Sequence, residues 1–458
     1  MSIPNANIPP SDSSRSPLQP TPKKNRRLWM MAGLTVVAVT SAAAGALVAM
    51  AIASTPLLQS NLSPDEAEVF GQGDRISTGM NFQLPQLTRP VNILVLGVKV
   101  LSSDLENPPE ETQDLGYHAL VNSFEGLSDT MLLLRFNPST GQLVVLSIPR
   151  DTRTWVEGLG ETKLNEANAY GGPALAATSV SELLGDVPID RYVRINVQGV
   201  EQLVEALGGV TVYVPQDMKY QDDSQHLYIN LEQGEQHLDG NEALQFLRFR
   251  YDENGDIGRV QRQQILMRAL IEQTIRPATL VRLPQILSVI QDNLDTNLSV
   301  EELVALAGFA SQTERADVQM LLLPGDFSYP DDYDLSYWLP SDRRIEEMVS
   351  QYFYDSGSST LATDLDTYLS IAIQDSTGSD GAVDELINSL YNAGYNDVYW
   401  DRTWSEPLAT TQIIAQQGDI ASAEAIHAAL GIGEVRVEST GSLQSDITIR
   451  LGEDWLQQ

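Results

Sequence analysis

The stretch FLRFRYDENGDIGRVQRQQ, residues 246–264, places four arginines within nineteen positions. The whole chain of 458 residues has 28 Lys and Arg against 62 Asp and Glu, a formal net charge of −34, so this local concentration of guanidinium groups needs a reason. Arg248 and Arg250 are two positions apart, and on an extended segment both would point to one face. Guanidinium groups bind phosphate oxygens through a rigid two-pronged fork. The stretch therefore predicts an anion site.

The second half of the same stretch predicts the start of a helix. Arg259, Arg262 and Gln263 have the i, i+3, i+4 spacing of side chains on one helix face, and Asp256 and Gly258 are expected in the turn before it. A helix N-terminus adds unpaired backbone N–H groups and a partial positive charge, which also favour phosphate. The alternative is a set of surface salt bridges to the abundant carboxylates.

Two further groups of polar residues border apolar strands. Arg150, Asp151 and Arg153 in SIPRDTRTW follow one strand directly, and α/β sheets hold ligands at such strand ends. Asp129 opens the strand before it, although spacing alone leaves open whether both groups lie at the same end. Carboxylates in this setting could hold Mg²⁺, which is usually shared with substrate phosphates. Lys163 in TKLNEANAYGG could add a positive charge near the same anion.

Composition excludes several other kinds of chemistry. The chain has no cysteine, which excludes disulfides, thiolate metal sites and a cysteine nucleophile. Its four histidines are far apart, and it has no H-E-x-x-H, G-x-S-x-G or Walker A motif. A net charge of −34 does not suit a protein that binds nucleic acid by neutralising phosphates, so nucleic acid is not an expected partner.

The elements that must position these residues are strands mixed with helices. Residues 91–100 form a nearly continuous apolar run, typical of a strand buried on both faces. Two more strands, TMLLLRFN and QLVVLSIPRD, flank the turn sequence at residues 138–141, which predicts a hairpin. Helical patterns follow, one of them interrupted at residues 171–173. This order predicts an α/β sheet covered on both faces.

The N-terminal residues predict a membrane anchor. Residues 1–27 are rich in Pro, Ser and Asn and end in a basic cluster, so we expect a disordered tail. Residues 28–53 carry no charge and are long enough to span a bilayer of about 30 Å. A cleaved signal peptide is the alternative reading. The positive-inside rule places the tail in the cytoplasm and the rest of the chain outside a plasma (inner) membrane crossed once.

The chain beyond the anchor divides into a larger and a smaller region. We expect a linker at 54–88, a globular region over residues 89–350 and a second linker at 351–364. Residues 365–456 alternate strands with amphipathic helices that stop at glycine, which predicts a small α/β domain.

Three motifs together are specific to one family. SDTMLLLRFNPSTGQLVVLSIPRDTR, KLNEANAYGG and FLRFRYDENGDIGRVQRQQ, in this order, resemble the LytR–CpsA–Psr (LCP) family over residues 89–350. IAIQDSTG and DITIRLGEDW give residues 365–456 a similarity to the LytR C-terminal domain. The resemblance implies an α-β-α sandwich with a mixed central sheet and an apolar tunnel for a lipid, after one transmembrane helix.

The resemblance also implies an activity. Such enzymes are Mg²⁺-dependent phosphotransferases that move a glycopolymer from a polyprenyl-pyrophosphate carrier to a hydroxyl of peptidoglycan or another wall glycan. It implies catalytic roles for Arg150, Arg248, Asp256 and Arg259, and metal binding by Asp129 and Asp151. The residues it implies for pyrophosphate binding are Arg150, Lys163, Arg248, Arg250, Arg259 and Gln263.

Two positions depart from the family pattern. The first strand commonly ends in Gly-x-Asp, whereas this chain has Gly97-Val98-Lys99, and Leu127 stands where an arginine often precedes the Ser-Asp pair. Asp104 could replace the missing carboxylate, or Lys99 could supply lost positive charge. Two other functions therefore stay open: a pyrophosphatase acting on the same lipid, and a catalytically idle envelope-binding or regulatory protein.

Overall fold

The computed structural model describes residues 62–71, 75–79, 85–99, 124, 126–222, 227–249, 255–276, 279, 282, 285–286, 288–289, 293–329, 332–354, 369–442 and 444–457. The predicted tail at 1–27 and the predicted anchor at 28–53 lie outside these residues. Among the helices of the described residues, none is both long enough and apolar enough to cross a bilayer.

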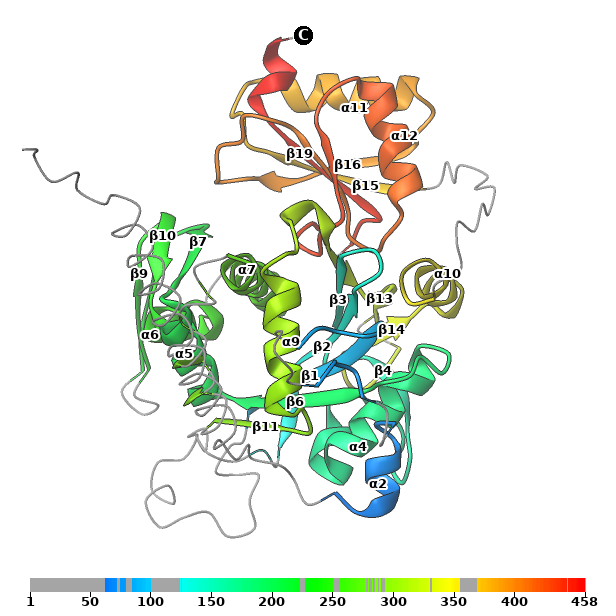
Figure 1. The fold of residues 1–458 in the computed structure, drawn as a ribbon. Helices are drawn as coiled ribbons and strands as arrows, with labels where there is room; N and C mark the ends of the chain where they lie inside the picture. Colours follow the sequence, from blue (N-terminus) through cyan, green and yellow to red (C-terminus); the bar gives the residue numbers. More distant parts are fainter. Residues whose placement is uncertain are drawn as a thin grey trace, which may run out of the picture. The chain divides into compact units, whose positions relative to one another are not determined.

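A mixed six-stranded sheet forms the centre of the larger region (Figure 1). Its strands, in spatial order, are β11 (Leu294–Thr296), β6 (Arg191–Asn196), β1 (Val91–Lys99), β2 (Leu127–Asn137), β3 (Gln142–Ile148) and β12 (Val318–Leu322). β2 is antiparallel to both β1 and β3, whereas β6 runs parallel to β1 and β12 parallel to β3. The predicted hairpin joins β2 to β3, and Gly141 takes a φ of 76° in its turn, a conformation that glycine adopts without strain.

Helices cover both faces of this sheet, as predicted. Leu94, Leu96 and Leu133 face a core shared with α4 (Glu166–Leu183) and α10 (Asp342–Tyr352). Ile93, Leu132 and their neighbours face the opposite core, which includes side chains of α7 (Gly255–Thr274) and α9 (Val300–Ala310). Successive strand residues point to opposite faces, so an unbroken apolar strand serves both cores. The α-β-α sandwich is confirmed.

Local sequence signals explain where the helices begin and bend. Ser299 caps α9 in a reciprocal pair with Glu302, which satisfies N–H groups that a helix start leaves unpaired. α4 is kinked at Gly171 and Gly172, just before Pro173. The predicted interruption at residues 171–173 is confirmed as a kink and not as the end of the helix.

A second cluster of elements packs beside the sheet around its own core. It consists of α5 (Val197–Leu207), β7 (Val210–Val214), β8 (Met218–Asp222), β9 (Leu227–Leu231), β10 (Gly234–Leu238) and α6 (Gly240–Arg248). α7 contributes Leu266 and Ala269 to this core while Met267 and Ile271 of the same helix pack on the central sheet. α7 therefore joins the two cores.

The C-terminal region is a five-stranded mixed sheet with two helices (Figure 1). Its strands, in spatial order, are β16 (Asp397–Thr403), β15 (Ser370–Asp375), β19 (Ile447–Leu451), β17 (Gln412–Ala415) and β18 (Glu434–Arg436). Its apolar face packs against α11 (Ala382–Asn392) and α12 (Ile420–Leu430). The alternating positions carry Gln374, Thr448 and Arg450, which are polar yet buried. The predicted small α/β domain is confirmed.

The C-terminal region completes one edge of the central sheet. β12 pairs with β3 on one side only. On its other side the N–H of Met320 donates to the carbonyl of Val437 (3.0 Å), and the N–H of Leu322 donates to the carbonyl of Gln416 (2.8 Å). An open sheet edge is a site for unwanted strand pairing, so these two bonds protect β12.

Two local predictions were wrong. Part of the predicted linker at 54–88 belongs to the fold: α2 (Pro64–Glu68) forms there, and Phe70 and Ile76 are fully buried. These apolar residues are isolated in an irregular backbone, so no periodic pattern in the sequence predicts that they are buried. The stretch around Arg248 is helical and not extended, because α6 includes Arg248 and the backbone extends only from Phe249.

Candidate functional site

Asp129 lies at an irregularity in the strand pair β1–β2. Gly97 is opposite Thr130 and Val98 is opposite Ser128, so Asp129 between them has no partner on β1. This is a β-bulge, a feature that re-aims side chains near active sites. A Cβ on residue 97 would lie 3.0 Å from the Cβ of Thr130, so the close approach favours glycine there.

Four charged side chains form a row at this end of the sheet. Nη1 of Arg150 lies 2.6 Å from Oδ1 of Asp129, and its Nε lies 3.3 Å from Oδ2 of Asp151. Nζ of Lys163 lies 2.7 Å from Oδ1 of Asp151. The antiparallel hairpin puts the start of β2 beside the end of β3, which answers the question that spacing alone left open: Asp129 and Arg150 share one edge.

Backbone hydrogen bonds hold these turns together. The N–H of Asn165 donates to the carbonyl of Arg150 (3.2 Å), and the N–H of Ser128 donates to the carbonyl of Asn165 (3.3 Å). Lys163 ends β5 (Gly160–Lys163), which pairs with β4 (Arg153–Val156). The first two sequence motifs therefore meet through main-chain contacts, and the charged row rests on regular strands.

The charges of this row are partly buried and mutually stabilised. The side chains of Arg150, Asp129 and Lys163 are 26%, 27% and 20% exposed. Burial alone would lower the pKa of Arg150, but the carboxylates of Asp129 and Asp151 outweigh it and raise this pKa above its ordinary value. A phosphate that replaced either carboxylate would meet a guanidinium already held in place.

One pocket of about 170 Å³ joins this charged row to an apolar wall. Its polar end has Asp129, Arg150, Asp151, Lys163 and Gln263, and its apolar side has Met131, Leu132, Ile148, Met267, Leu322, Phe327 and Trp338. It is smaller than the usual pocket for a whole organic ligand, about 300–1,000 Å³. The pocket therefore suits a charged group with a short apolar segment attached.

The pocket wall also carries buried polar atoms without partners. Both amide atoms of Gln264 and the indole Nε1 of Trp338 are buried without a hydrogen bond. An unpaired buried polar group typically costs about 1–3 kcal/mol. Gln264 and Trp338 both line the pocket, so these unpaired atoms belong to residues of its wall.

An aromatic segment, residues 326–340, forms part of this wall. β13 (Gly325–Phe327) pairs with β14 (Trp338–Pro340), and the N–H of Trp338 donates to the carbonyl of Asp151 (2.9 Å). Nζ of Lys163 lies 5.6 Å from the ring centre of Tyr337. Sequence reasoning missed these residues; their aromatic clustering in DFSYPDDYDLSYWLP was the available signal.

Within the predicted arginine cluster of residues 246–264, the structure describes the side chains of Arg248, Arg262 and Gln263. Gln263 lines the pocket. Arg262 is 3% exposed, donates to the carbonyl of Phe249 and lies over its ring, so it is a structural residue. Arg248 ends α6. Arg250 lies outside the described residues.

The residues predicted in a turn before the helix are already helical. α7 begins at Gly255, so the backbones of Asp256, Gly258 and Arg259 belong to its first turns. The prediction of a turn at Asp256 and Gly258 was wrong, because neither residue type forbids a helix start. Arg259 and Gln263 keep the i, i+4 relation expected of them.

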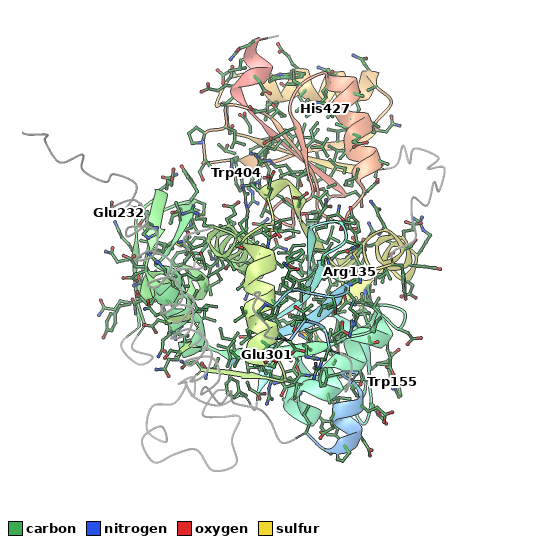
Figure 2. All side chains as sticks on the ribbon, viewed as in Figure 1. Arg135, Trp155, Glu232, Glu301, Trp404 and His427 are labelled. Atoms are coloured by element: carbon green, nitrogen blue, oxygen red, sulfur yellow. The ribbon has the colours of Figure 1, made fainter. Side chains whose placement is uncertain are left out.

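Other arginines near the motifs belong elsewhere. Arg135 of TMLLLRFN, labelled in Figure 2, lies toward the other end of β2 from Asp129, is 7% exposed and donates to Oδ1 of Asn92 (3.4 Å). Arg153 pairs with Glu161 across the β4–β5 hairpin. Neither lines the pocket.

The two departures from the family pattern are neighbours. Lys99 is the register partner of Leu127 across β1 and β2, two residues before Asp129. Leu127 is 38% exposed, and Asp104 lies outside the described residues. The changes therefore fall together at the rim of one strand pair and leave the charged row itself complete.

The described residues contain no group of three or more acidic or histidine side chains arranged for a metal ion. Asp129 and Asp151 nevertheless converge on one guanidinium at the polar end of the pocket. One or two carboxylates completed by substrate phosphates are a usual donor set for Mg²⁺. This pair fits that arrangement when a phosphorylated ligand supplies the remaining oxygens.

Two larger cavities lie away from the charged row. One of about 740 Å³ lies between α4 and α10 and has a wall of mixed character. Another of about 410 Å³ lies between α7 and the C-terminal region. Volume alone does not identify the reaction site, and we assign it to the smaller pocket because only there do the residues of the three motifs meet.

Comparison with known proteins agrees with this architecture. The model of the LytR_cpsA_psr family matches residues 60–353, more than half of the chain. The chain belongs to the LytR_cpsA_psr family. Its match begins before residue 89, in agreement with the buried residues found in the predicted linker. A second model, described as LytR cell envelope-related transcriptional attenuator, matches residues 368–455, so a LytR_C domain follows the LytR_cpsA_psr domain.

This LytR_cpsA_psr protein is similar to proteins named polyisoprenyl-teichoic acid–peptidoglycan teichoic acid transferase TagU. The relative from Bacillus cereus is 31% identical over 280 residues, which are 60% of this chain and 82% of that protein. The relative from Oceanobacillus iheyensis is 35% identical over 223 residues, 47% of this chain and 61% of that protein. Among solved structures, B. subtilis TagV is 27% identical with a TM-score of 0.46, covering 57% of this chain and 96% of that one.

Proposed function

We propose that this protein transfers a glycopolymer from a polyprenyl-pyrophosphate carrier to a hydroxyl of peptidoglycan or a related wall glycan. One observation carries the proposal: a single pocket joins the row Asp129–Arg150–Asp151–Lys163 to an apolar wall. A lipid pyrophosphate has the same two parts, a charged head and an apolar chain. The names of the relatives describe this kind of donor and acceptor.

The reaction requires little covalent chemistry from the protein. The acceptor hydroxyl oxygen forms a bond to the phosphorus next to the sugar, the bond from that phosphorus to the bridging oxygen breaks, and polyprenyl phosphate leaves. The proton of the hydroxyl passes to the departing polyprenyl phosphate or to water. The result is a phosphodiester between polymer and acceptor. Charge stabilisation and positioning supply most of the catalysis in such transfers.

The described residues have distinct tasks in this scheme. Arg150 holds phosphate oxygens, and its two carboxylate neighbours fix the plane of its guanidinium group. Lys163 neutralises charge from the β5 side, and the amide of Gln263 hydrogen-bonds the head group from α7. We propose that Arg248, Arg250, Asp256 and Arg259 complete the site, as the family resemblance implies.

We propose Mg²⁺ as the cofactor, held by Asp129 and Asp151 together with the pyrophosphate. When bound, it would neutralise charge on the phosphoryl oxygens. The protein's own contribution is to place the two carboxylates around Arg150, so that cation and guanidinium act on the same head group.

We propose a location to match a lipid substrate. Residues 28–53 would anchor the chain in the plasma membrane with residues 1–27 in the cytoplasm, and the LytR_cpsA_psr and LytR_C domains would lie outside. The donor lipid would then occupy the same bilayer as the enzyme.

Transfer by the Arg150→Ala variant tests the assignment. Losing one well-placed charge-stabilising donor often costs about 3 kcal/mol, or about a hundredfold in rate. The control is Arg343→Ala, which removes an arginine that is 74% exposed and paired with Glu347 on α10. The purified full chain is given a polyprenyl-pyrophosphate glycan and peptidoglycan, and the phosphodiester-linked product is measured.

We expect the control to match the wild type and Arg150→Ala to lose about two orders of magnitude. Equal transfer by both variants contradicts the proposed site. Release of free phosphate without a linked product identifies a pyrophosphatase, and no turnover by a correctly folded wild type identifies an idle protein.

A further inference from the structure

A second cavity, which we call the interdomain cavity, lies between α7 and the polar face of the C-terminal sheet. Its volume is about 410 Å³, and its wall includes Arg268 of α7, Trp404 and Glu406 after β16, and Arg450 of β19. Figure 2 labels Trp404 on the C-terminal domain. The proposed transfer does not use this cavity.

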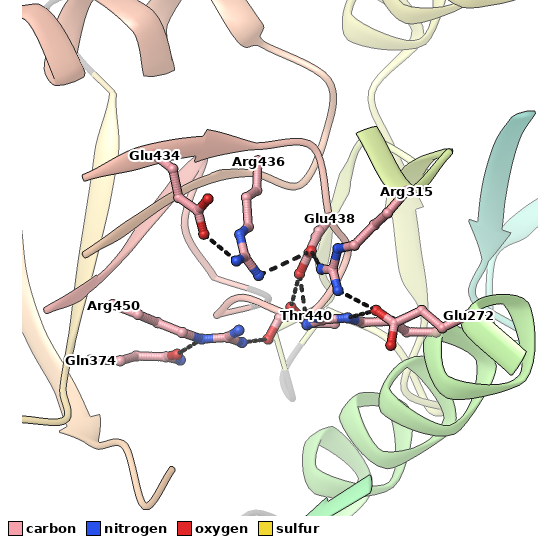
Figure 3. A network of polar contacts seen from close by, with 9 residues as sticks. Glu272, Arg315, Gln374, Glu434, Arg436, Glu438, Thr440 and Arg450 are labelled. Carbon is pink, nitrogen blue, oxygen red and sulfur yellow. Dashed lines mark hydrogen bonds and ion pairs between the residues drawn. The ribbon is translucent and has the colours of Figure 1, made fainter. Parts of the chain in front are cut away.

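Arg450 is a buried cation without a carboxylate beside it. It is 2% exposed, and its guanidinium donates to Oε1 of Gln374 (2.9 Å) and to the carbonyl of Thr440 (Figure 3). Among the described residues, no carboxylate lies within the 4.0 Å of an ion pair with it. Buried charges are normally paired, so this residue lacks its usual counter-ion.

The neighbouring arginines do have counter-ions. Glu438 pairs with Arg268 (3.0 Å), Arg315 (2.7 Å) and Arg436 (3.6 Å). Figure 3 shows the pairs with Arg315 and Arg436 near Arg450. Burial lowers the pKa of Arg450 to about 9. The nearby Arg268 and Arg402 act in the same direction, whereas the carboxylates of Glu438 and Glu406 act against it. A pKa of about 9 leaves the guanidinium charged at neutral pH, with its charge uncompensated at short range.

Trp404, which lines the same cavity, carries a second donor. Its indole Nε1 is buried without a hydrogen-bond partner. The guanidinium carbon of Arg450 lies 3.7 Å from the Trp404 ring centre, so the cation and the indole belong to one unit. A cation–π contact alone accounts for this stacking, but it gives no acceptor for the indole N–H.

The remaining polar groups of the wall suit hydroxyl groups. The carboxylates of Glu406 and Glu235 line the cavity, and carboxylates accept hydrogen bonds from sugar hydroxyls. A purely anionic ligand such as inorganic phosphate would gain nothing from them. A sugar that carries an anionic group uses both kinds of residue.

We propose that the interdomain cavity binds an anionic sugar, with its phosphate or carboxylate at Arg450 and the Trp404 indole N–H and its hydroxyls toward Glu406. A chain whose formal net charge is −34 would otherwise repel such a ligand, so a local cation is needed. This site is separate from the transfer pocket and does not require the proposed transfer to occur.

Calorimetry with N-acetylglucosamine 1-phosphate tests the site. The full chain in detergent carries Arg150→Ala, which removes the main anion contact of the transfer pocket. Adding Trp404→Phe keeps an aromatic ring and removes the indole N–H. We expect affinity to fall about tenfold to a hundredfold, the value of one hydrogen bond to a charged group. The control Trp400→Phe changes an indole on β16 that is 55% exposed and lies outside the cavity wall.

Two further ligands test separately whether the sugar and its anionic group are both needed for binding. N-acetylglucosamine without phosphate and inorganic phosphate without sugar are each expected to bind at least tenfold more weakly than the sugar phosphate. Arg450→Gln is expected to abolish binding, and Trp404→Phe covers the case in which that variant does not fold. Absence of binding in the Arg150→Ala chain, or equal affinity of Trp404→Phe and Trp400→Phe, overturns the proposal. Neither result would contradict the proposed transfer, because that proposal is tested separately by the linked product of the wild-type chain.

Discussion

Replacing Glu438 by alanine should loosen the LytR_C domain from α7. Glu438 is 9% exposed and accepts from Arg268 on α7 and from Arg315 after α9, both in the LytR_cpsA_psr domain. Breaking a buried ion pair by removing one partner costs about 3–5 kcal/mol, because it leaves a charge uncompensated. The contacts that remain around the arginines determine where in this range the loss of stability falls.

Each arginine around Glu438 keeps another carboxylate after the substitution. Arg268 and Arg315 still contact Glu272, and Arg436 still contacts Glu434. Arg315 is also 46% exposed, so solvent screens much of its charge. We therefore expect the lower end of the range, about 3 kcal/mol. For a domain of the size of LytR_C, residues 368–455, that corresponds to a fall in melting temperature of about 12–24 °C.

Thermal unfolding of the full chain measures the loss, and amide hydrogen exchange locates it. The N–H groups of Met320 and Leu322 report on the contact directly, because they donate to Val437 and Gln416 across the domain boundary. The control is Glu434→Ala. The side chain of Glu434 also pairs with Arg436 but is 47% exposed, so its loss should change stability by less than about 1 kcal/mol. The reasoning is refuted if Glu438→Ala melts like the control and exchange at Met320 and Leu322 stays slow.

Other predictions follow from single features. Burial alone would raise the pKa of Glu438, but the guanidinium groups around it, Arg268 first, lower it below its ordinary value of 4.5. The stability that it contributes is therefore complete above pH 4.5 and is lost as the pH falls below that value toward the folded pKa; an acid series of melting curves should be flatter for Glu438→Gln, and parallel curves argue against this. Gln264→Met removes an amide with two buried unpaired atoms and should raise stability by about 1–3 kcal/mol while reducing transfer; loss of stability in urea would mean that the amide has a partner. Gly97→Ala puts a Cβ 3.0 Å from that of Thr130 and should destabilise by about 1–3 kcal/mol, whereas an unchanged urea midpoint would show that the bulge adjusts freely.

The strands of the central sheet could be predicted because their signal is local. β1, β2 and β3 are apolar runs, and a short turn sequence separates β2 from β3. A continuous apolar run is enough to predict a strand that is buried on both faces. The sequence motifs likewise brought Arg150, Lys163 and Gln263 into one hypothesis, and the structure places all three around one pocket.

The rest of the site depends on information that spacing does not carry. The register of β2 against β3 brings Asp129 next to Arg150. The β-bulge opposite Gly97 sets the direction of the Asp129 side chain. Arg262 has the same type and spacing as its neighbours yet turns inward to Phe249, because tertiary packing chooses between equivalent helix positions. Phe70 entered the core from an apparently irregular segment for the same reason.

The hydrogen bonds from Met320 and Leu322 to the LytR_C domain also delay completion of the central sheet while the chain is being synthesised. Their partners, Val437 and Gln416, are synthesised roughly a hundred residues later. At about 5–20 residues per second, the outer edge of β12 waits for about 5–20 s before its acceptors exist. During that interval the nascent chain exposes a strand edge to any neighbouring nascent chain, and crowded synthesis is the condition under which misassembly of this protein should begin.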